Sequence, residues 1–231
     1  MPERVVLFDF DGTLGWIDGG WVGSFLGLMR ERGLADGVTL EQARPGFSEG
    51  FRWQRPKQAH PMIIRAEEWW GEVEPIFERM ALRLGAPEDV AGELSRAFRG
   101  RYLEPERWRL FPEVVPCLAA LKEDGWILEI ASNHVPELAL IVDHLGISGS
   151  FRKIHSSAWM GYEKPNPNFY GAITRNLSQD ARVWMVGDSL EADYLGARQA
   201  GLDSILVRKA SPEADRFLVD LTGLPSYLAR S

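Results

Sequence analysis

The sequence predicts an α/β protein in which a doubly wound parallel sheet carries an inserted, all-helical domain. Apolar runs of strand length occur in the first few residues and then only after about Trp126, and the stretch between them has helical periodicity. After Pro112, strand-length and helix-length segments alternate, which is typical of a parallel sheet covered by helices. We therefore expect residues 1–14 and 110–231 to form a Rossmann-like core and residues 15–109 to form the helical insertion.

The first predicted strand is the apolar run from Val5 to Phe10. It holds one acid, Asp9, near its end, a pattern typical of a strand covered on both faces. The dipeptide Asp11-Gly12 follows it and favours a turn. Two aspartates are thus expected at the carboxyl end of a buried strand.

The inserted stretch is predicted to consist of several helices. Apolar residues such as Trp21, Phe25 and Leu28 recur at helical spacing, and prolines divide the stretch into separate segments. Six of the nine tryptophans lie here or at its edges. Because large aromatic side chains mostly serve packing, we expect them to fill a helical core rather than to line a ligand site.

Beyond Pro112 the sequence predicts alternating helices and strands. The expected order is helix 114–123, strand 126–131, helix 136–145, strand 151–156, helix 168–176, strand 182–186, helix 192–200 and strand 204–207. A glycine lies one or two residues beyond the end of several of these helices, as is common at the C-terminal end of a helix. Residues 216–228 are expected to form a short helix.

Composition excludes several classes of protein. The chain carries 26 Lys and Arg against 33 Asp and Glu, a net charge of −7 without a basic block, which excludes the usual surface of nucleic-acid or anionic-membrane binders. Cys117 is the only cysteine, so no intrachain disulfide can form. With neither a signal-peptide profile nor a membrane-length apolar stretch, we expect a cytoplasmic protein of undetermined oligomeric state.

Polar residues at the carboxyl ends of the strands are the candidates for a site, because ligands of doubly wound sheets bind there. The candidates at the end of the first strand and directly after it are Asp9, Asp11 and Thr13; those at later strand ends or in the loop before helix 168–176 are Ser132, Asn133, Asp188 and Lys164. We expect all of them to converge on one crevice.

Three of these candidates are acids whose charges need compensation. Asp9 and Asp11 are two residues apart on an extended chain and point the same way, so their carboxylates repel unless a cation or a shared proton intervenes. With Asp188 as a third acid, Mg²⁺ is the expected cation, because it prefers oxygen ligands and bridges to phosphate. Zn²⁺ is not expected, since the four histidines show no ligand spacing.

This set of residues suits covalent phosphoryl transfer. A carboxylate can attack a metal-bound phosphate while a second acid protonates the leaving oxygen and later deprotonates water. The Lys164 ammonium can neutralise the phosphoryl group, and the hydroxyls of Thr13 and Ser132 can bind its oxygens. Asn133 either contacts the phosphate or orients its loop through backbone bonds.

Four motifs resemble those of the haloacid dehalogenase-like hydrolase superfamily. They are Asp9-Phe10-Asp11-Gly12-Thr13-Leu14, Ala131-Ser132-Asn133, Lys164-Pro165 and Gly187-Asp188-Ser189-Leu190-Glu191-Ala192-Asp193, in that order. One such motif is moderately specific, whereas four ordered motifs on the expected elements are strongly specific. The resemblance covers residues 1–14 and roughly 110–210, and the insertion corresponds only in position and helical character.

The resemblance implies a role for each matching residue. Asp9 would be the nucleophile and Asp11 the general acid and base. Mg²⁺ would be bound by Asp9, the backbone carbonyl of Asp11 and Asp188, with Asp193 supporting this site or tethering Lys164. The residues in contact with the phosphoryl group would be Thr13, Ser132 and Lys164. The insertion would be a cap that closes over the site and selects the substrate.

Asp11 separates two activities of the superfamily. Members that cleave carbon–halogen bonds lack an acid at this position and need no metal, so the resemblance implies phosphate-ester hydrolysis. The chain departs from the pattern at Pro112-Glu113, where members often have Pro-Gly. We expect this change to leave the chemistry unaffected.

The leading expectation is a Mg²⁺-dependent phosphatase that hydrolyses the phosphate monoester of a small metabolite through an aspartyl-phosphate. A phosphomutase built on the same core and a catalytically silent protein that binds a phospho-ligand are alternatives. A receiver-type signalling domain combines similar residues, but it is shorter, has another chain order and lacks the insertion. The sequence does not identify the substrate.

Overall fold

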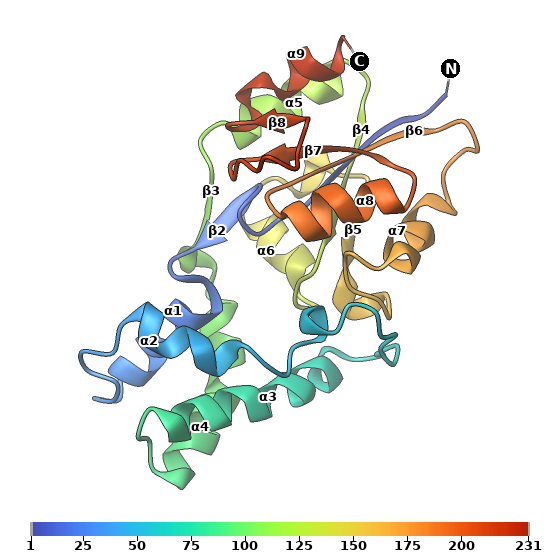
Figure 1. The fold of residues 1–231 in the computed structure, drawn as a ribbon. Helices are drawn as coiled ribbons and strands as arrows, with labels where there is room; N and C mark the ends of the chain where they lie inside the picture. Colours follow the sequence, from blue (N-terminus) through green and yellow to red (C-terminus); the bar gives the residue numbers. More distant parts are fainter. Residues whose placement is uncertain (1, 231) are drawn as a thin grey trace. The chain divides into compact units, whose positions relative to one another are not determined.

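The structure, a computed structural model, describes residues 2–230 and divides into two compact units (Figure 1). One unit comprises Met1–Trp16, Pro56–Met62 and Arg109–Ser231, and the other comprises Ile17–Arg55 and Ile63–Trp108. The sequence divides the chain at residues 14 and 110. The units differ from that division chiefly at Pro56–Met62, which belongs to the first unit although it lies within the inserted stretch.

The first unit is built on a six-stranded parallel sheet, which confirms the predicted fold class. The strand order is β5-β4-β1-β6-β7-β8, and every neighbouring pair is parallel. The strands are β1 (Arg4–Phe8), β4 (Ile127–Ser132), β5 (Lys153–Ser156), β6 (Arg182–Gly187), β7 (Asp203–Val207) and β8 (Phe217–Leu218). Central β1 pairs with both β4 and β6, so its carboxyl end lies between theirs.

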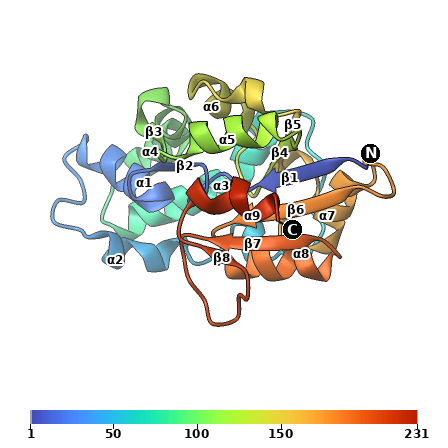
Figure 2. The same cartoon turned by 90° about the horizontal axis from the view of Figure 1, so that it is seen from above.

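Helices cover both faces of this sheet (Figure 2). They are α5 (Val114–Glu123), α6 (Leu138–His144), α7 (Pro167–Thr174), α8 (Gly196–Gln199) and α9 (Leu224–Leu228). Short 3₁₀ turns are η4 (Ser148–Ser150), η5 (Ser157–Trp159) and η7 (Leu221–Gly223), and η6 (Leu190–Leu195) is π-helical. Among residues 2–230, no helix has both the length and the apolarity that a membrane crossing requires.

The expectation of a single helix over residues 216–228 was wrong. This stretch contains the short strand β8, the turn η7 and the five-residue helix α9. Leu206 and Val207 of β7 pair with Phe217 and Leu218, so the sheet takes up these two residues at its edge. A strand this short carries no periodicity that distinguishes it from a helix in the sequence.

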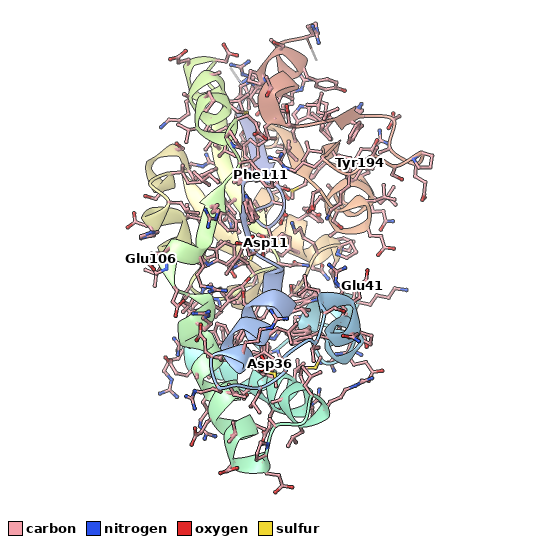
Figure 3. The ribbon with its side chains drawn as sticks, turned by 90° about the vertical axis from the view of Figure 1, so that its left-hand side faces the viewer. Asp11, Asp36, Glu41, Glu106, Phe111 and Tyr194 are labelled. Atoms are coloured by element: carbon pink, nitrogen blue, oxygen red, sulfur yellow. The ribbon has the colours of Figure 1, made fainter. Side chains whose placement is uncertain are left out.

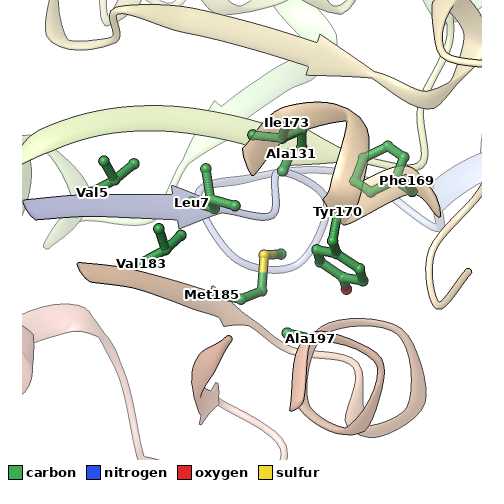
Figure 4. Packing of buried hydrophobic residues seen from close by; sticks show 9 residues of the cluster. All are labelled: Val5, Leu7, Ala131, Phe169, Tyr170, Ile173, Val183, Met185 and Ala197. Carbon is green, nitrogen blue, oxygen red and sulfur yellow. The ribbon is translucent and has the colours of Figure 1, made fainter. Parts of the chain in front are cut away.

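Alternate residues of β1 point to opposite faces, and both faces are apolar. Val5 and Leu7 pack against Phe169 and Tyr170 of α7, as Figure 4 shows. The complete cluster is Val5, Leu7, Ala131, Phe169, Tyr170, Ile173, Val183, Met185 and Ala197. Because β1 is buried on both sides, the residues that directly follow it start from a rigidly held position.

The second unit is helical. Its helices are α1 (Gly20–Arg30), α2 (Leu40–Ala43), α3 (Ala66–Arg83) and α4 (Glu88–Tyr102), with 3₁₀ turns η1 (Arg44–Phe47), η2 (Arg52–Gln54) and η3 (Pro105–Arg107). A separate two-stranded sheet consists of β2 (Gly15–Ile17) and β3 (Trp108–Leu110). Trp69 and Trp70 are 1% and 2% exposed, and Trp21 stacks on Tyr102 with ring centroids 4.4 Å apart. The prediction that the tryptophans fill a core is confirmed for Trp69, Trp70 and Trp108, whereas Trp16, Trp21 and Trp53 are half-buried.

A buried carboxylate in β4 allows a test of the fold by pH. Arg152 Nε donates to Glu129 Oε1 at 2.7 Å, and His155 Nε2 lies 2.7 Å from Glu129 Oε2. Burial alone would raise the pKa of Glu129, but these two bonds outweigh it and lower the pKa below its ordinary value of 4.5.

We expect Glu129→Gln to lower the free energy of unfolding by about 1–3 kcal/mol at neutral pH, because it weakens charge-assisted hydrogen bonds in a buried place. Since the folded state lowers this pKa, the stabilisation is present above pH 4.5 and is lost as the pH falls below it. Urea unfolding at several pH values measures the difference, with exposed Glu123→Gln as the control. A difference that stays constant down to acidic pH contradicts this assignment.

Candidate active site

The predicted nucleophile lies where β1, β4 and the Lys164 loop meet. Asp9 follows β1 and donates its N–H to the Val186 carbonyl oxygen at 2.9 Å, which continues the pairing with β6. Its Oδ1 accepts from Ser132 Oγ and from Lys164 Nζ, both at 2.8 Å. Thr13 Oγ1 lies 3.5 Å from Oδ2. The structure thus brings three predicted residues, Thr13, Ser132 and Lys164, together around the carboxylate of Asp9.

Lys164 is a buried cation shared by two acids. Its side chain is 2% exposed, and besides Asp9 it donates to Asp193 Oδ1 at 2.6 Å. Burial alone would lower the pKa of Lys164, but the negative charges of Asp193 and Asp9 outweigh it and raise the pKa. The other oxygen of Asp193 accepts the Ser189 N–H at 3.0 Å. Asp193 therefore tethers Lys164, one of the two roles that the sequence left open.

Asn133 holds the backbone of the same loop. Its Nδ2 donates to the Lys164 carbonyl oxygen at 2.9 Å, and its Oδ1 accepts the Lys164 N–H at 2.7 Å. Both ends of the amide are therefore engaged by one residue. This geometry is that of the loop-orienting alternative, and the predicted contact between Asn133 and phosphate stays a prediction.

Asp11 lies in the turn after β1 (Figure 3). Burial and the negative charges of Asp9 and Asp188 raise its pKa well above the usual range of an aspartate. His134 Nε2 lies 3.3 Å from Asp11 Oδ2, and burial lowers the pKa of His134 to about 4. A neutral imidazole thus faces a carboxyl group that holds its proton unusually well. His134 is not among the residues predicted from the sequence, although it directly follows the motif that ends at Asn133.

Asp188 directly follows β6 and is 7% exposed. Burial and the charge of Asp9 raise its pKa, while a hydrogen bond from the Lys209 ammonium opposes the rise. Lys209 lies just beyond β7 and was not predicted as a site residue. In the sequence it is one charged residue in a polar stretch, and only the pairing of β6 with β7 brings it to Asp188.

Two backbone positions in the site require glycine, because a carboxylate of the site lies very close to each of them. A Cβ on Gly12 would lie 2.4 Å from Asp188 Oδ2, and the φ of Gly12 is +77°. A Cβ on Gly187 would lie 2.2 Å from the Asp193 carboxyl carbon. Both distances are far below van der Waals contact, so any side chain at either position displaces an acid of the site.

The acids present a donor set that fits Mg²⁺. Asp9, Asp188 and Asp193 each offer one carboxylate oxygen, and these oxygens lie within 4.8 Å of one another. Hard oxygen donors of this kind are the ligands that Mg²⁺ prefers. Both carboxylate oxygens of Asp193 already accept a hydrogen bond, one from Lys164 and the other from the Ser189 N–H, so Asp9 and Asp188 are the better candidates for direct ligands.

The chain is similar to known proteins in sequence and in fold. A profile of the haloacid dehalogenase-like hydrolase family matches residues 3–201. A glyceraldehyde 3-phosphate phosphatase of Methanothermobacter thermautotrophicus is 34% identical over 96% of this chain and 92% of its own. A phosphoglycolate phosphatase of Aquifex aeolicus is 28% identical over 88% of this chain and 84% of its own. A magnesium-bound hydrolase structure from Bacillus subtilis has a TM-score of 0.77 at 20% identity, covering 99% of this chain and 100% of that one.

Proposed function

The chain belongs to the haloacid dehalogenase-like hydrolase family and is a hydrolase, and we propose that it cleaves a small metabolite's phosphate monoester through an aspartyl-phosphate on Asp9. The observation that carries the proposal is the Asp9 carboxylate, fixed by Ser132 and Lys164 beside an acid, Asp11, of raised pKa. The relatives named as phosphatases of glyceraldehyde 3-phosphate and phosphoglycolate support a small phosphorylated substrate.

In the first step Asp9 displaces the leaving group. Ser132 and Lys164 both hold Oδ1, which fixes the rotation of the carboxylate and leaves Oδ2 as the attacking atom. A bond forms between Oδ2 and phosphorus while the ester bond from phosphorus to the leaving oxygen breaks. Asp11, in its protonated form, gives its proton to that oxygen, and burial together with the negative charges of Asp9 and Asp188 favours that form by raising the pKa of Asp11.

In the second step water releases the phosphate. The Asp11 carboxylate takes a proton from a water molecule as the water oxygen attacks phosphorus. The bond from phosphorus to Asp9 breaks, which restores Asp9 as a carboxylate and Asp11 as an acid. Throughout, the Lys164 ammonium stays charged and held by Asp193, so it can stabilise the negative charge of the phosphoryl group.

We propose that Mg²⁺ is the cofactor, held by Asp9, Asp188 and the backbone carbonyl of Asp11. When bound, it offsets the negative charge of the phosphoryl oxygens. The magnesium-bound structure with the same fold supports this choice of ion.

We also place the protein in the cytoplasm, because its single cysteine needs no oxidising compartment.

Phosphate release from a panel of phosphorylated sugars, sugar acids and nucleotides tests this function. We expect release in Mg²⁺, none in EDTA, and recovery when Mg²⁺ is restored. A set of 2-haloacids, assayed for halide release, is the control for the other activity that the fold supports. Halide release, or phosphate release that EDTA leaves unchanged, contradicts the proposal. Release that depends on a bisphosphate activator favours a mutase.

A further inference from the structure

Arg208 lies directly beyond β7, and its side chain reaches the turn after β1. Its Nη2 and Nε donate to the Thr13 carbonyl oxygen at 2.7 and 3.3 Å. Nη2 also lies 2.7 Å from Glu113 Oε1, and the guanidinium lies 3.5 Å from the ring centroid of Phe111, which Figure 3 labels. One side chain therefore joins this turn to the residues that precede α5.

The backbone of Arg208 is in an unusual conformation. Its φ is +65°, in the left-handed region that residues other than glycine adopt rarely and only where their surroundings hold them. The Arg208 N–H donates to the Leu218 carbonyl oxygen at 3.0 Å, which anchors the strained residue to β8. The next residue, Lys209, binds Asp188. Two consecutive cations beyond β7 thus reach two different parts of the site.

The Thr13 carbonyl is a position from which the turn can be held. Hydrogen bonds within the turn run from the Gly12 N–H to the Gly15 carbonyl oxygen at 2.8 Å and from the Thr13 N–H to the Phe10 carbonyl oxygen at 3.2 Å. The Thr13 carbonyl oxygen instead accepts both bonds from Arg208. The contact therefore sets the orientation of the Thr13 peptide group, whose own hydroxyl lies beside Asp9 Oδ2.

We propose that Arg208, directed by Glu113, is a positioning residue that holds Thr13 in register with Asp9. The inference rests on the proposed function. A planar guanidinium can contact a carbonyl, a carboxylate and a ring together, whereas a lysine ammonium cannot reproduce that geometry. Glu113 acts only through Arg208. On this proposal the change at Pro112-Glu113 does bear on the chemistry, contrary to what the sequence led us to expect.

Arg208→Lys tests the proposal, with Arg216→Lys as a matched control. Arg216 belongs to the same unit, lies over the Trp184 ring at 5.0 Å and pairs with Asp203 Oδ1 at 2.5 Å. Both variants lose an arginine that stacks and pairs, but only one loses the contact with Thr13. For Arg208→Lys we expect kcat to fall about tenfold and KM to rise by a similar factor, because a displaced turn impairs both the reacting geometry and the binding of the phosphoryl group.

Calorimetric titration with inorganic phosphate provides a second readout. We expect the dissociation constant to rise about tenfold in Arg208→Lys and to stay unchanged in Arg216→Lys, since the Thr13 turn contributes to phosphate binding. Thermal midpoints are expected to fall equally in both. Unchanged kcat and phosphate affinity in Arg208→Lys, or equal losses in Arg216→Lys, overturn the proposal.

Glu113→Gln keeps Arg208 and covers the case in which Arg208→Lys fails to fold. We expect it to lower kcat about threefold, because the guanidinium loses a charged partner but keeps its bonds to Thr13. No change in this variant overturns the role of Glu113. If the unmodified chain releases phosphate from no compound, the proposed function fails, whereas the phosphate titrations still decide the positioning.

Discussion

Asp9→Asn is expected to abolish phosphate release, with a loss of at least about 10³-fold in kcat, because an amide cannot form the covalent intermediate. The fold should persist. Lys164 keeps Asp193 as a partner, and an asparagine oxygen can still accept from Ser132. Steady-state assays with the best substrate of the panel, beside circular dichroism of the same preparations, measure both effects.

The control for this variant is Asp180→Asn. Asp180 is an exposed aspartate of the same unit, so Asp180→Asn removes one negative charge, as Asp9→Asn does, but at a position outside the site. We expect full activity from it. Substantial residual activity in Asp9→Asn, after contamination by wild-type protein is ruled out, would contradict the assignment of Asp9 as the nucleophile.

Lys164→Met is expected to remove both activity and stability. The variant leaves the carboxylates of Asp9 and Asp193 buried without the cation that now lies 2.8 and 2.6 Å from them. Breaking a buried ion pair in this way costs about 3–5 kcal/mol of unfolding free energy. The phosphoryl group loses its protein cation as well, so kcat should fall at least about 100-fold. Denaturant unfolding and phosphate release measure the two losses.

A second substitution separates these two effects. Asp193→Asn added to Lys164→Met removes one uncompensated acid, so it should restore part of the stability but none of the activity. Lys153→Met, at an exposed position of β5, should change neither quantity by much. A Lys164→Met variant as stable and as active as the parent chain contradicts the role given to this buried cation.

The sequence alone was sufficient to predict those site residues that lie at the carboxyl ends of the sheet strands. Because carboxyl ends of neighbouring parallel strands lie together, Asp9, Ser132 and Asp188 could be assigned to one site from the strand pattern alone. The strand and helix alternation after Pro112 appears in the structure nearly as expected, for example in α5 and β7. Apolar runs with adjacent glycines and turns are strong local signals, so they needed no tertiary information.

Residues that depend on tertiary contacts could not be found in this way. Lys209 and Arg208 reach the site only because β7 lies beside β6, and in the sequence they are two ordinary charged residues. His134 needed the fold to bring it to Asp11.

The segment Pro56–Met62 is a further case. Hydrogen bonds such as that from the His60 N–H to the Gly161 carbonyl oxygen, at 2.8 Å, join this segment to the first unit. No periodicity in the sequence predicts such a contact.

The most direct test of the account is chemical trapping of the phosphorylated enzyme. The protein is mixed with its best substrate, quenched in acid within the first turnover and treated with borohydride, which reduces an acyl-phosphate of aspartate to homoserine. Peptide mass spectrometry then locates the change. Modification is expected at Asp9 only, dependent on substrate and lost in Asp9→Asn. Turnover with no modification at Asp9, or with modification at another residue, contradicts it.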